Sequence, residues 1–194
     1  TIDKQRVLFL RQVDDVAGAA HDRTLVDHMI TRIGERMQVP LNHLDIIEKF
    51  NGVDILQSQL FVKVHCHTYI QKILAVHGWQ DDAKTAGVLP LPMRQDSAYQ
   101  RSLKTAKGPT DPKATCDLET QMGFGYRQTI GELIFAMTIA RPDISYSVIK
   151  LSQYAAAPAR EHYLAIRQIY KYLAATSDYG LQYWRREPRM DLPY

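Results

Sequence analysis

The strongest constraint on the fold is a series of three apolar stripes in the C-terminal part of the sequence, with prolines between them. In each stripe apolar residues recur every three or four positions, the spacing of a helix with one buried face. The stripes comprise Ile130, Leu133, Ile134 and Met137, then Ile144, Val148, Leu151 and Ala155, then Ala165, Ile166, Ile169, Tyr172 and Leu173. Pro142 disfavours helical backbone just before it, Pro158 suits the first turn of a helix, and Gly180 can end one. We therefore predict a compact subdomain of three helices with short joints.

The N-terminal part of the sequence alternates between strand-like and helical patterns. Residues 6–20 contain an apolar run, a polar centre and a run of small residues, which predicts a β-hairpin. Residues 25–37 have helical spacing, with Asp22 or Thr24 available as the N-cap and Pro40 as a stop.

A second predicted hairpin follows this helix. It joins a strand over residues 50–56 to a strand over residues 60–64 through a polar turn at 57–59. A short helix should come next, because its apolar positions share one face. These positions are Ile70, Ile73, Leu74 and His77.

Residues 81–123 interrupt all periodicity, and we predict an irregular, mobile linker there. The interruptions are glycines and prolines, together with five cations between Arg94 and Lys113. This divides the chain into residues 1–80, the linker, and a helical unit over residues 124–194. The predicted fold class is α+β: an antiparallel sheet with helices, followed by a mostly helical unit.

Composition limits the partners and the compartment only weakly. Lys and Arg number 24 against 21 Asp and Glu, a net charge of +3 that is compatible with nucleic acid. No apolar run approaches the roughly 20 residues that cross a bilayer, and the N-terminus has no signal-peptide layout, so we expect no membrane partner. Cys66 and Cys116 are too few for a disulfide framework, which fits a reducing, intracellular compartment. Because the chain begins at Thr1 rather than Met, we expect a piece of a longer polypeptide.

Asp14 and Asp15 are the residues that most strongly suggest chemistry. They lie together at the tip of the first predicted hairpin. Two adjacent carboxylates are costly to bury unpaired, and they are the hard oxygen ligands that magnesium prefers. Nucleotidyl transfer uses two such ions about 3.5–4 Å apart. An ordinary acidic turn is the alternative interpretation, because Asp is common in turns.

Several motifs resemble those of copia-type retrotransposon reverse transcriptases. Leu10-Arg11-Gln12-Val13-Asp14-Asp15 is similar to the family's "YVDD" motif, Phe50-Asn51-Gly52-Val53-Asp54-Ile55 to its "FLGIEI" segment, and Tyr69-Ile70-Gln71-Lys72-Ile73-Leu74 to its "YI.KLL" helix. A longer block resembles "YR..VG.L.YL..TRPDI..AV..LS....P...H..A..R...YL.GT...GL.Y". The matching residues are Tyr126-Arg127, Gly131-Glu132-Leu133, Arg141-Pro142-Asp143-Ile144, Leu151-Ser152, Pro158, His162, Tyr172-Leu173 and Gly180-Leu181. The resemblance covers nearly the whole chain.

The resemblance implies the end of the palm, followed by the thumb and connection, of a magnesium-dependent RNA-directed DNA polymerase. It implies a Mg²⁺ ligand at Asp14, with Asp15 beside it as a second, less essential one. Gln12 stands where the family has a tyrosine near the primer terminus, so we expect an altered contact there. The second hairpin would grip the primer strand, and its implied contact residues are Phe50, Asn51 and Gly52.

The resemblance also implies partners and a location. The partners would be an RNA/DNA template–primer and deoxynucleotide triphosphates, with fingers and RNase H domains in adjacent parts of a polyprotein. The family's other metal-binding aspartate would lie upstream of Thr1, so we expect that this chain alone does not polymerise. Cytoplasmic virus-like particles and the nucleus would be its locations. A non-catalytic, retrotransposon-derived module for nucleic-acid binding or assembly is the alternative function.

The last predicted helix carries further candidates. Arg160, Arg167 and Lys171 are interleaved with aromatic residues, and such a mixture can clamp a nucleic-acid backbone. A solvated basic face opposite an apolar core face explains the same pattern equally well. On this helix we expect His162 to be buried or to cap the helix rather than to act in catalysis.

Two other polar groups have simpler explanations. His65-Cys66-His67 could suggest zinc, with the two histidines on one face of a strand. No second pair of ligands lies at a finger-like distance, so we do not expect a structural metal there. Asp81-Asp82 is interpreted as a solvated turn.

Overall fold

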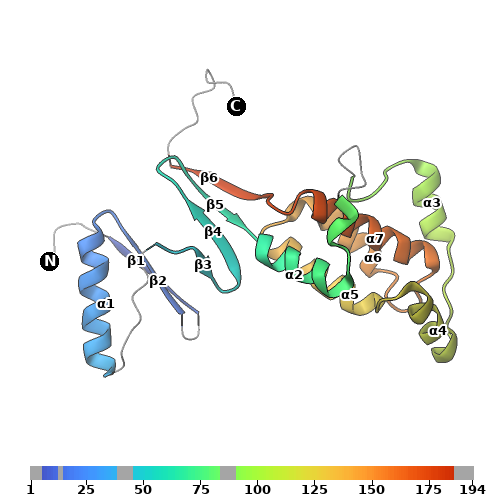
Figure 1. The fold of residues 1–194 in the computed structure, drawn as a ribbon, viewed down its shortest axis with the longest axis horizontal. Helices are drawn as coiled ribbons and strands as arrows, with labels where there is room; N and C mark the ends of the chain where they lie inside the picture. The colour runs from blue at the N-terminus through green and yellow to red at the C-terminus, as the bar shows by residue number, and fades with distance from the viewer. Residues whose placement is uncertain (1–5, 13–14, 39–45, 84–90, 186–194) are drawn as a thin grey trace, which may run out of the picture.

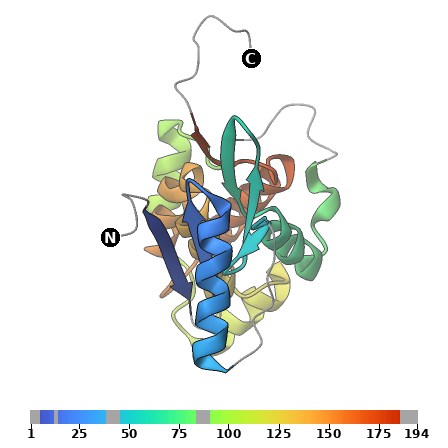
Figure 2. The same ribbon diagram turned by 90° about the vertical axis from the view of Figure 1, so that its left-hand side faces the viewer.

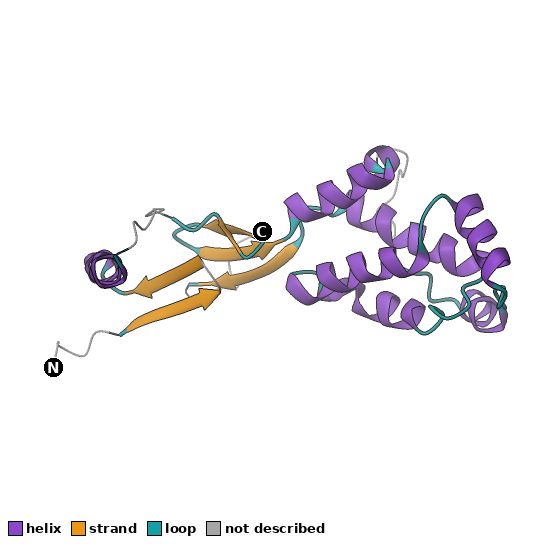
Figure 3. Ribbon diagram, turned by 90° about the horizontal axis from the view of Figure 1, so that it is seen from below, coloured by secondary structure: helices purple, strands orange, loops and turns teal. Residues whose placement is uncertain are grey.

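The computed structural model describes residues 6–12, 15–38, 46–83 and 91–185 of the chain. They form three units in a row: an N-terminal hairpin with one helix, a four-stranded sheet, and a helical unit (Figure 1, Figure 3). This mixture of helices and antiparallel strands confirms the predicted α+β class. Within the described ranges no helix is both long and apolar enough to cross a lipid bilayer.

The N-terminal unit contains the predicted hairpin and helix. Its elements are β1 (Val7–Gln12), β2 (Asp15–Ala20) and α1 (Arg23–Met37), and the two strands are antiparallel. Asp22 is the N-cap, as predicted, because its Oδ1 accepts a hydrogen bond from the Thr24 N–H at 2.9 Å. α1 lies against β2 (Figure 2), where a Cβ on Gly18 would come within 2.7 Å of Val26 Cγ1. The missing side chain therefore lets the helix approach the hairpin closely.

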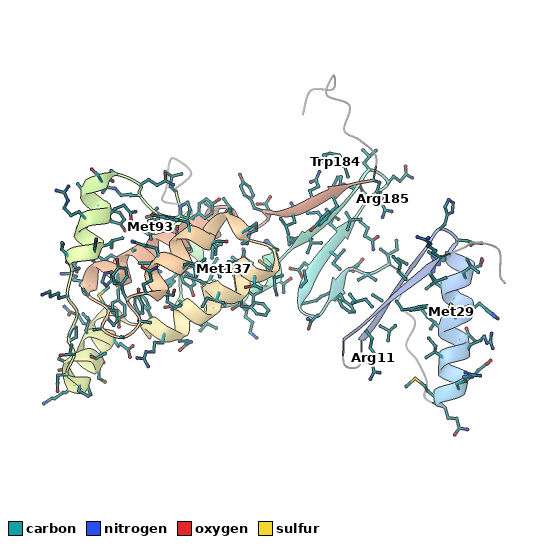
Figure 4. The ribbon with its side chains drawn as sticks, turned by 180° about the vertical axis from the view of Figure 1, so that it is seen from behind. Arg11, Met29, Met93, Met137, Trp184 and Arg185 are labelled. Atoms are coloured by element: carbon teal, nitrogen blue, oxygen red, sulfur yellow. The ribbon has the colours of Figure 1, made fainter. Side chains whose placement is uncertain are left out.

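The described residues of this N-terminal unit form no core of their own. Among the described residues, none ahead of Asp54 is buried. Leu8 is 70% exposed on β1, and Met37 is 60% exposed on α1. Figure 4 shows Met29 on α1, far from the densely packed side chains of the helical unit. The apolar stripe of α1 is helical as predicted, but the rest of the described chain does not bury it.

The middle sheet is antiparallel, with the strand order β3-β4-β5-β6. Its strands are β3 (Lys49–Phe50), β4 (Val53–Gln57), β5 (Phe61–His65) and β6 (Gly180–Trp184). The prediction of one strand over residues 50–56 is wrong at its start. Asn51 and Gly52 have positive φ angles of 49° and 78°, and they form the turn between β3 and β4. A hairpin turn of type I′ needs positive φ at both central residues, which the Asn-Gly pair supplies at low cost.

β6 belongs to the segment that was predicted to be helical. It pairs with β5 from Phe61↔Trp184 to His65↔Gly180. Gly180 is required at this pairing, since a Cβ there would lie 2.3 Å from the Val64 carbonyl oxygen. A strand of residues 124–194 thus completes a sheet that began within residues 1–80.

The helical unit contains the hydrophobic core. Its helices are α2 (His67–His77), α3 (Ser97–Thr105), α4 (Pro112–Met122), α5 (Tyr126–Ile139), α6 (Ser145–Ser152) and α7 (Arg160–Ala175), with 3₁₀ turns η1 (Gln80–Ala83) and η2 (Pro142–Ile144). α5, α6 and α7 are the three predicted helices, and Leu133, Leu151 and Ile166 from their stripes are fully buried. Pro158 lies just before the N-cap Ala159 rather than in the first turn of α7. Figure 4 shows Met93 and Met137 within this unit.

The prediction of an irregular, mobile linker over residues 81–123 is wrong for much of that segment. α3 and α4 lie in it, and both contact α7. Each helix begins with an aspartate N-cap, Asp96 or Asp111. α3 has one fully buried residue, Leu103, and α4 has none, so neither helix shows a long apolar stripe in the sequence. Gly108 lies so close to Pro158 that a Cβ would come within 2.3 Å of the proline carbonyl oxygen.

A buried arginine joins the centre of this unit to the end of α7. Arg141 is fully buried, and it donates to the Thr176 carbonyl oxygen at 2.8 Å and to Thr176 Oγ1 at 2.7 Å. Its Nη2 donates to Asp143 Oδ2 at 2.7 Å, and Tyr172 donates to the same oxygen. A buried charge is tolerated only when it is paired and hydrogen-bonded, and here both conditions hold. The network holds η2 against the C-terminal end of α7.

We predict that Arg141→Ala lowers the free energy of unfolding by about 3 kcal/mol, because Thr176 and Asp143 lose the guanidinium that donates hydrogen bonds to them. This loss of stability lies near the low end of the range for removing one partner of a buried ion pair, about 3–5 kcal/mol, since the Asp143 side chain is 34% exposed and can be solvated. Urea denaturation followed by circular dichroism measures it. The exposed Arg160→Ala on α7 is the control and should change stability by less than about 0.5 kcal/mol. Equal effects of the two changes would contradict this role for Arg141.

Candidate functional site

The first candidate site is the closed end of the β1–β2 hairpin. The register pairs Gln12 with Asp15, so these two backbones face each other at the last paired position. Asp14 lies outside the described residues, and the side chains of Gln12 and Asp15 are likewise not described. Their predicted roles as metal ligands and as a primer contact stay predictions. Among the residues that the structure does describe, no group of three or more His, Cys, Asp or Glu side chains could hold a metal.

The second candidate site is the β3–β4 turn, which contains Phe50, Asn51 and Gly52. Asn51 and Gly52 are exposed at the end of the sheet. The sheet behind them is fixed by Asp54, whose carboxylate accepts from the Thr68 N–H at 2.7 Å and from Thr68 Oγ1 at 2.8 Å. Because Thr68 lies in the first turn of α2, Asp54 joins the sheet to the helical unit. The sequence interpretation missed this role of Asp54; an acid in a strand ahead of a helix start was the available signal.

The cations of α7 do not form one uniform surface. Arg160 and Lys171 are exposed, as a nucleic-acid contact requires. The guanidinium carbon of Arg167 instead lies 3.9 Å from the centroid of the Trp79 ring. Trp79 also stacks with His77, with ring centroids 4.4 Å apart, and it contacts the rings of Phe124 and Tyr170 edge-on. The structure therefore separates Arg167, which stacks within the helical unit, from the two exposed cations.

The segment His65-Cys66-His67 differs from the strand that was assumed for it. β5 ends at His65 and α2 begins at His67, and the two rings have centroids 6.5 Å apart. Cys66 between them is fully buried, and burial raises the pKa of its thiol to about 11. The protonated thiol is therefore a core group at neutral pH, and it is a poor metal ligand.

Curated proteins with similar sequences come mainly from transposons. The retrovirus-related Pol polyprotein from transposon RE2 of Arabidopsis thaliana is 27% identical over 177 residues, which make up 90% of this chain and 11% of that protein. The corresponding polyprotein from transposon RE1 of the same plant is 29% identical over 178 residues, 92% of this chain and 11% of that protein. This chain is similar to a segment of retrotransposon Pol polyproteins. It spans about a ninth of the length of these two relatives.

A shorter likeness has a different source. Secreted RxLR effector protein 161 of Plasmopara viticola is 35% identical over 60 residues, 31% of this chain and 42% of that protein. No family model matches the chain, and no solved structure matches it. The long likeness to Pol polyproteins agrees with the copia-type resemblance of the sequence motifs, including the block from Tyr126 to Leu181.

The residues of that Pol-like block are mainly structural. Glu132 of α5 lies between α2 and α7, with its Oε2 2.9 Å from His77 Nε2 and accepting from the Tyr170 hydroxyl. Burial alone would raise the pKa of the Glu132 carboxyl, but hydrogen bonds from Tyr170, His77 and Gln128 together hold it below its usual value. The charged carboxylate thus joins three helices. The sequence interpretation gave Glu132 no role.

His162 is buried and caps α7, as predicted. It is fully buried, its Nδ1 accepts from the Ala159 N–H at 2.9 Å, and its Nε2 lies 2.8 Å from the Leu103 carbonyl oxygen. The first contact needs an acceptor nitrogen and the second needs a donor, so the ring is neutral with its proton on Nε2. Tyr154 stacks on the ring with centroids 3.9 Å apart. Burial lowers the pKa of His162, and the ring holds α3 against α7.

We predict that protonation of His162 destabilises the fold in acid. Its folded pKa is below the unfolded value of 6.5, so the unfolded chain binds the proton first and stability falls as the pH drops below about 6.5. His162→Gln should remove this part of the pH dependence and should cost about 1–3 kcal/mol at pH 8, because a buried partner is lost. Urea denaturation at pH 8, 7, 6 and 5 measures both effects.

The exposed His28→Gln on α1 is the matched control for this change, and at pH 8 it should alter the free energy of unfolding by less than about 0.5 kcal/mol. If wild type and His162→Gln lost stability in parallel as the pH fell, the neutral-ring assignment would be wrong.

Proposed function

We propose that this chain is part of the RNA-directed DNA polymerase of a copia-type retrotransposon Pol polyprotein. The observation that carries the proposal is the likeness to two Pol polyproteins along about nine-tenths of the chain. It is supported by the hairpin register, which brings Asp15 opposite Gln12 at the end where the Asp14-Asp15 pair lies in the sequence. The enzyme would add deoxynucleotides to a primer 3′ hydroxyl in a magnesium-dependent reaction.

The donor set of the hairpin fits Mg²⁺. Asp14 and Asp15 supply carboxylate oxygens, the hard ligands that this ion takes, rather than the sulfur or imidazole groups that favour zinc. When bound, Mg²⁺ would stabilise the charge that develops on the transferred phosphate. The two aspartates are half of a carboxylate site in this proposal. The other metal-binding aspartate, the fingers and the RNase H domain would come from other segments of the polyprotein.

The remaining residues of the chain would position the template–primer. The exposed Asn51-Gly52 turn, held on the sheet that Asp54 fixes to α2, would contact the primer strand together with Phe50. The exposed cations Arg160 and Lys171 would contact backbone phosphates of the duplex. Copying would take place in cytoplasmic particles, with later access to the nucleus.

A non-catalytic nucleic-acid-binding or assembly module is the second candidate. The likeness to a protein described as a secreted RxLR effector favours it, because that protein is not a Pol polyprotein. The absence of buried residues among the described positions ahead of Asp54 also favours it, since a catalytic pair needs rigid support. In this case the aspartate pair would have no catalytic role.

The catalytic proposal predicts that Asp14→Asn lowers primer extension at least about 100-fold in a Pol polyprotein that carries this chain with its flanking segments. A metal ion contributes several kcal/mol of charge stabilisation in the transition state, and each 1.4 kcal/mol or so is tenfold in rate. Template–primer affinity, measured by fluorescence anisotropy, should stay unchanged. Asp22→Asn is the matched control in the same unit, since asparagine also caps a helix.

Unchanged extension by Asp14→Asn would contradict the proposed catalytic role. Primer extension by the isolated chain would contradict the view that the site is incomplete within it. A polyprotein that binds template–primer but extends no primer, with or without the change, would favour the binding module.

The phosphate-contact proposal predicts different salt dependences for the cations of α7. Lys171→Gln and Arg160→Gln should each weaken duplex binding uniformly across sequences and reduce the slope of log affinity against log salt by about 1. Arg167→Gln should leave that slope unchanged and reduce stability instead, because Arg167 stacks on Trp79. Anisotropy titrations between about 50 and 200 mM salt measure the slopes. Equal slopes for all three variants would contradict the proposal that Arg160 and Lys171 contact phosphates whereas Arg167 does not.

A further inference from the structure

The outer edge of β6 is free of partners in the described part of the chain. β6 is the last strand in the order β3-β4-β5-β6, and its inner edge pairs with β5. The Arg185 N–H donates to the Leu60 carbonyl oxygen at 2.8 Å, which continues the same register. Because hydrogen-bonded positions alternate along an antiparallel strand, Leu181 and Tyr183 also direct their backbone groups toward β5. The backbone groups that point outward therefore belong to Gly180, Gln182 and Trp184.

This edge has none of the usual features that prevent pairing with another strand. Natural edge strands are protected by lysines, prolines, bulges or extreme shortness. β6 contains no charged residue and no proline, and it pairs with β5 along all five of its residues without a bulge. Tyr183 is 58% exposed and Trp184 is 45% exposed, and Figure 4 shows Trp184 and Arg185 at the end of the strand. The opposite edge, β3, has only two residues.

We propose that β6 pairs with β6 of a second copy of this chain, antiparallel and centred on Gln182, to form a two-fold dimer. In this register Gln182 lies opposite the partner's Gln182, and Gly180 lies opposite the partner's Trp184. Every outward N–H and C=O group of these residues gains a hydrogen-bond partner. A two-fold contact uses the same surface on both copies and closes on itself, so one free edge on each copy is sufficient.

The side chains along β6 complement one another in this pairing. The partner's Trp184 lies opposite Gly180, which has no side chain. A Cβ at this position would clash with the Val64 carbonyl oxygen. Tyr183 lies opposite the partner's Leu181, on the same face of the sheet as Val62 and Val64. Aromatic residues placed across from glycine or aliphatic residues stabilise antiparallel strand pairs.

The charges at the two ends of β6 suit a second copy of this chain in antiparallel orientation. Asp178 is exposed just before the strand, and Arg185 is exposed just after it. Arg185 donates to two neutral groups of its own chain, the Ser58 carbonyl at 3.0 Å and Gln57 Oε1 at 3.2 Å. In this register Arg185 lies opposite the partner's Tyr179, so the acidic end of each β6, at Asp178, lies beside the basic end of the partner's β6, at Arg185, twice in the dimer. Parallel pairing would instead bring the two arginines together, which is unfavourable.

Analytical ultracentrifugation of the chain over a wide concentration range tests this dimer. Wild type should show a reversible monomer–dimer equilibrium, and Gln182→Pro should raise its dissociation constant at least about tenfold, because the central N–H of each copy is lost. The Gln182 N–H points away from β5, so the substitution leaves the pairing within the chain intact, and circular dichroism verifies this. Gln182→Thr keeps the N–H and a strand-forming side chain, and it should dimerise like wild type.

Cross-linking tests the register by a second route, in a Cys116→Ser background because Cys116 is exposed. Gln182→Cys places two thiols at a self-opposed, hydrogen-bonded position, with Cα atoms about 5.5 Å apart and within disulfide reach. It should form a covalent dimer under mild oxidation, whereas Leu56→Cys on β4, also exposed, should not.

Three results would overturn the proposed dimer. The wild-type chain could stay monomeric at every concentration tested, the dissociation constant could be unchanged by Gln182→Pro, or both cysteine variants could cross-link equally. The outcome is independent of nucleic-acid binding, so it does not depend on whether the polymerase proposal holds.

Discussion

The arrangement of the described chain depends on one buried charge, the guanidinium of Arg141. Taking this group out of water is costly, and the structure offsets the cost with donations to Asp143 and to both oxygens of Thr176. Thr176 ends α7, and only a few residues later the chain enters β6, which completes the sheet. Fixing Thr176 therefore fixes where β6 meets β5. The segment from Arg141 to Ile144, which resembles a family motif, thus holds the end of α7 in place next to the sheet.

The buried core and the hairpin that contains the aspartate pair lie at different ends of the molecule. Core packing begins at Cys66 and is concentrated in the helical unit, where Tyr126, Tyr163 and Tyr170 are fully or almost fully buried. The aspartate pair belongs to a hairpin with Leu8 and Leu10 exposed. A metal site needs ligands held rigidly, so the N-terminal unit is the part in which the polymerase proposal requires support from other segments of a polyprotein. The helical unit, in contrast, has the polar and apolar contacts of a self-sufficient scaffold.

Periodicity predicted the helices that carry an apolar stripe in the sequence. α1, α5, α6 and α7 were found this way, and Asp22 was one of the two expected caps. α3 and α4 were missed because neither carries a long apolar stripe: α3 buries a single residue, Leu103, and α4 buries none. The Asn51-Gly52 turn was present in the sequence as a strong hairpin signal, but it was absorbed into a longer apolar run. Of the candidate site, the burial of His162 was predicted correctly, whereas the stacking of Arg167 on Trp79 was not foreseen.

The sequence by itself determined the α+β class, the helical stripes and the likeness to retrotransposon Pol segments, because these depend on local spacing and on order along the chain. Only the tertiary structure decided that Arg141, Glu132 and His162 join helices, that β6 returns to β5, and that Arg167 stacks on an indole while Lys171 stays exposed. These facts depend on contacts between residues distant in sequence. Local pattern holds no information on such contacts, since the partner that neutralises a charge or completes a sheet is chosen by packing in three dimensions.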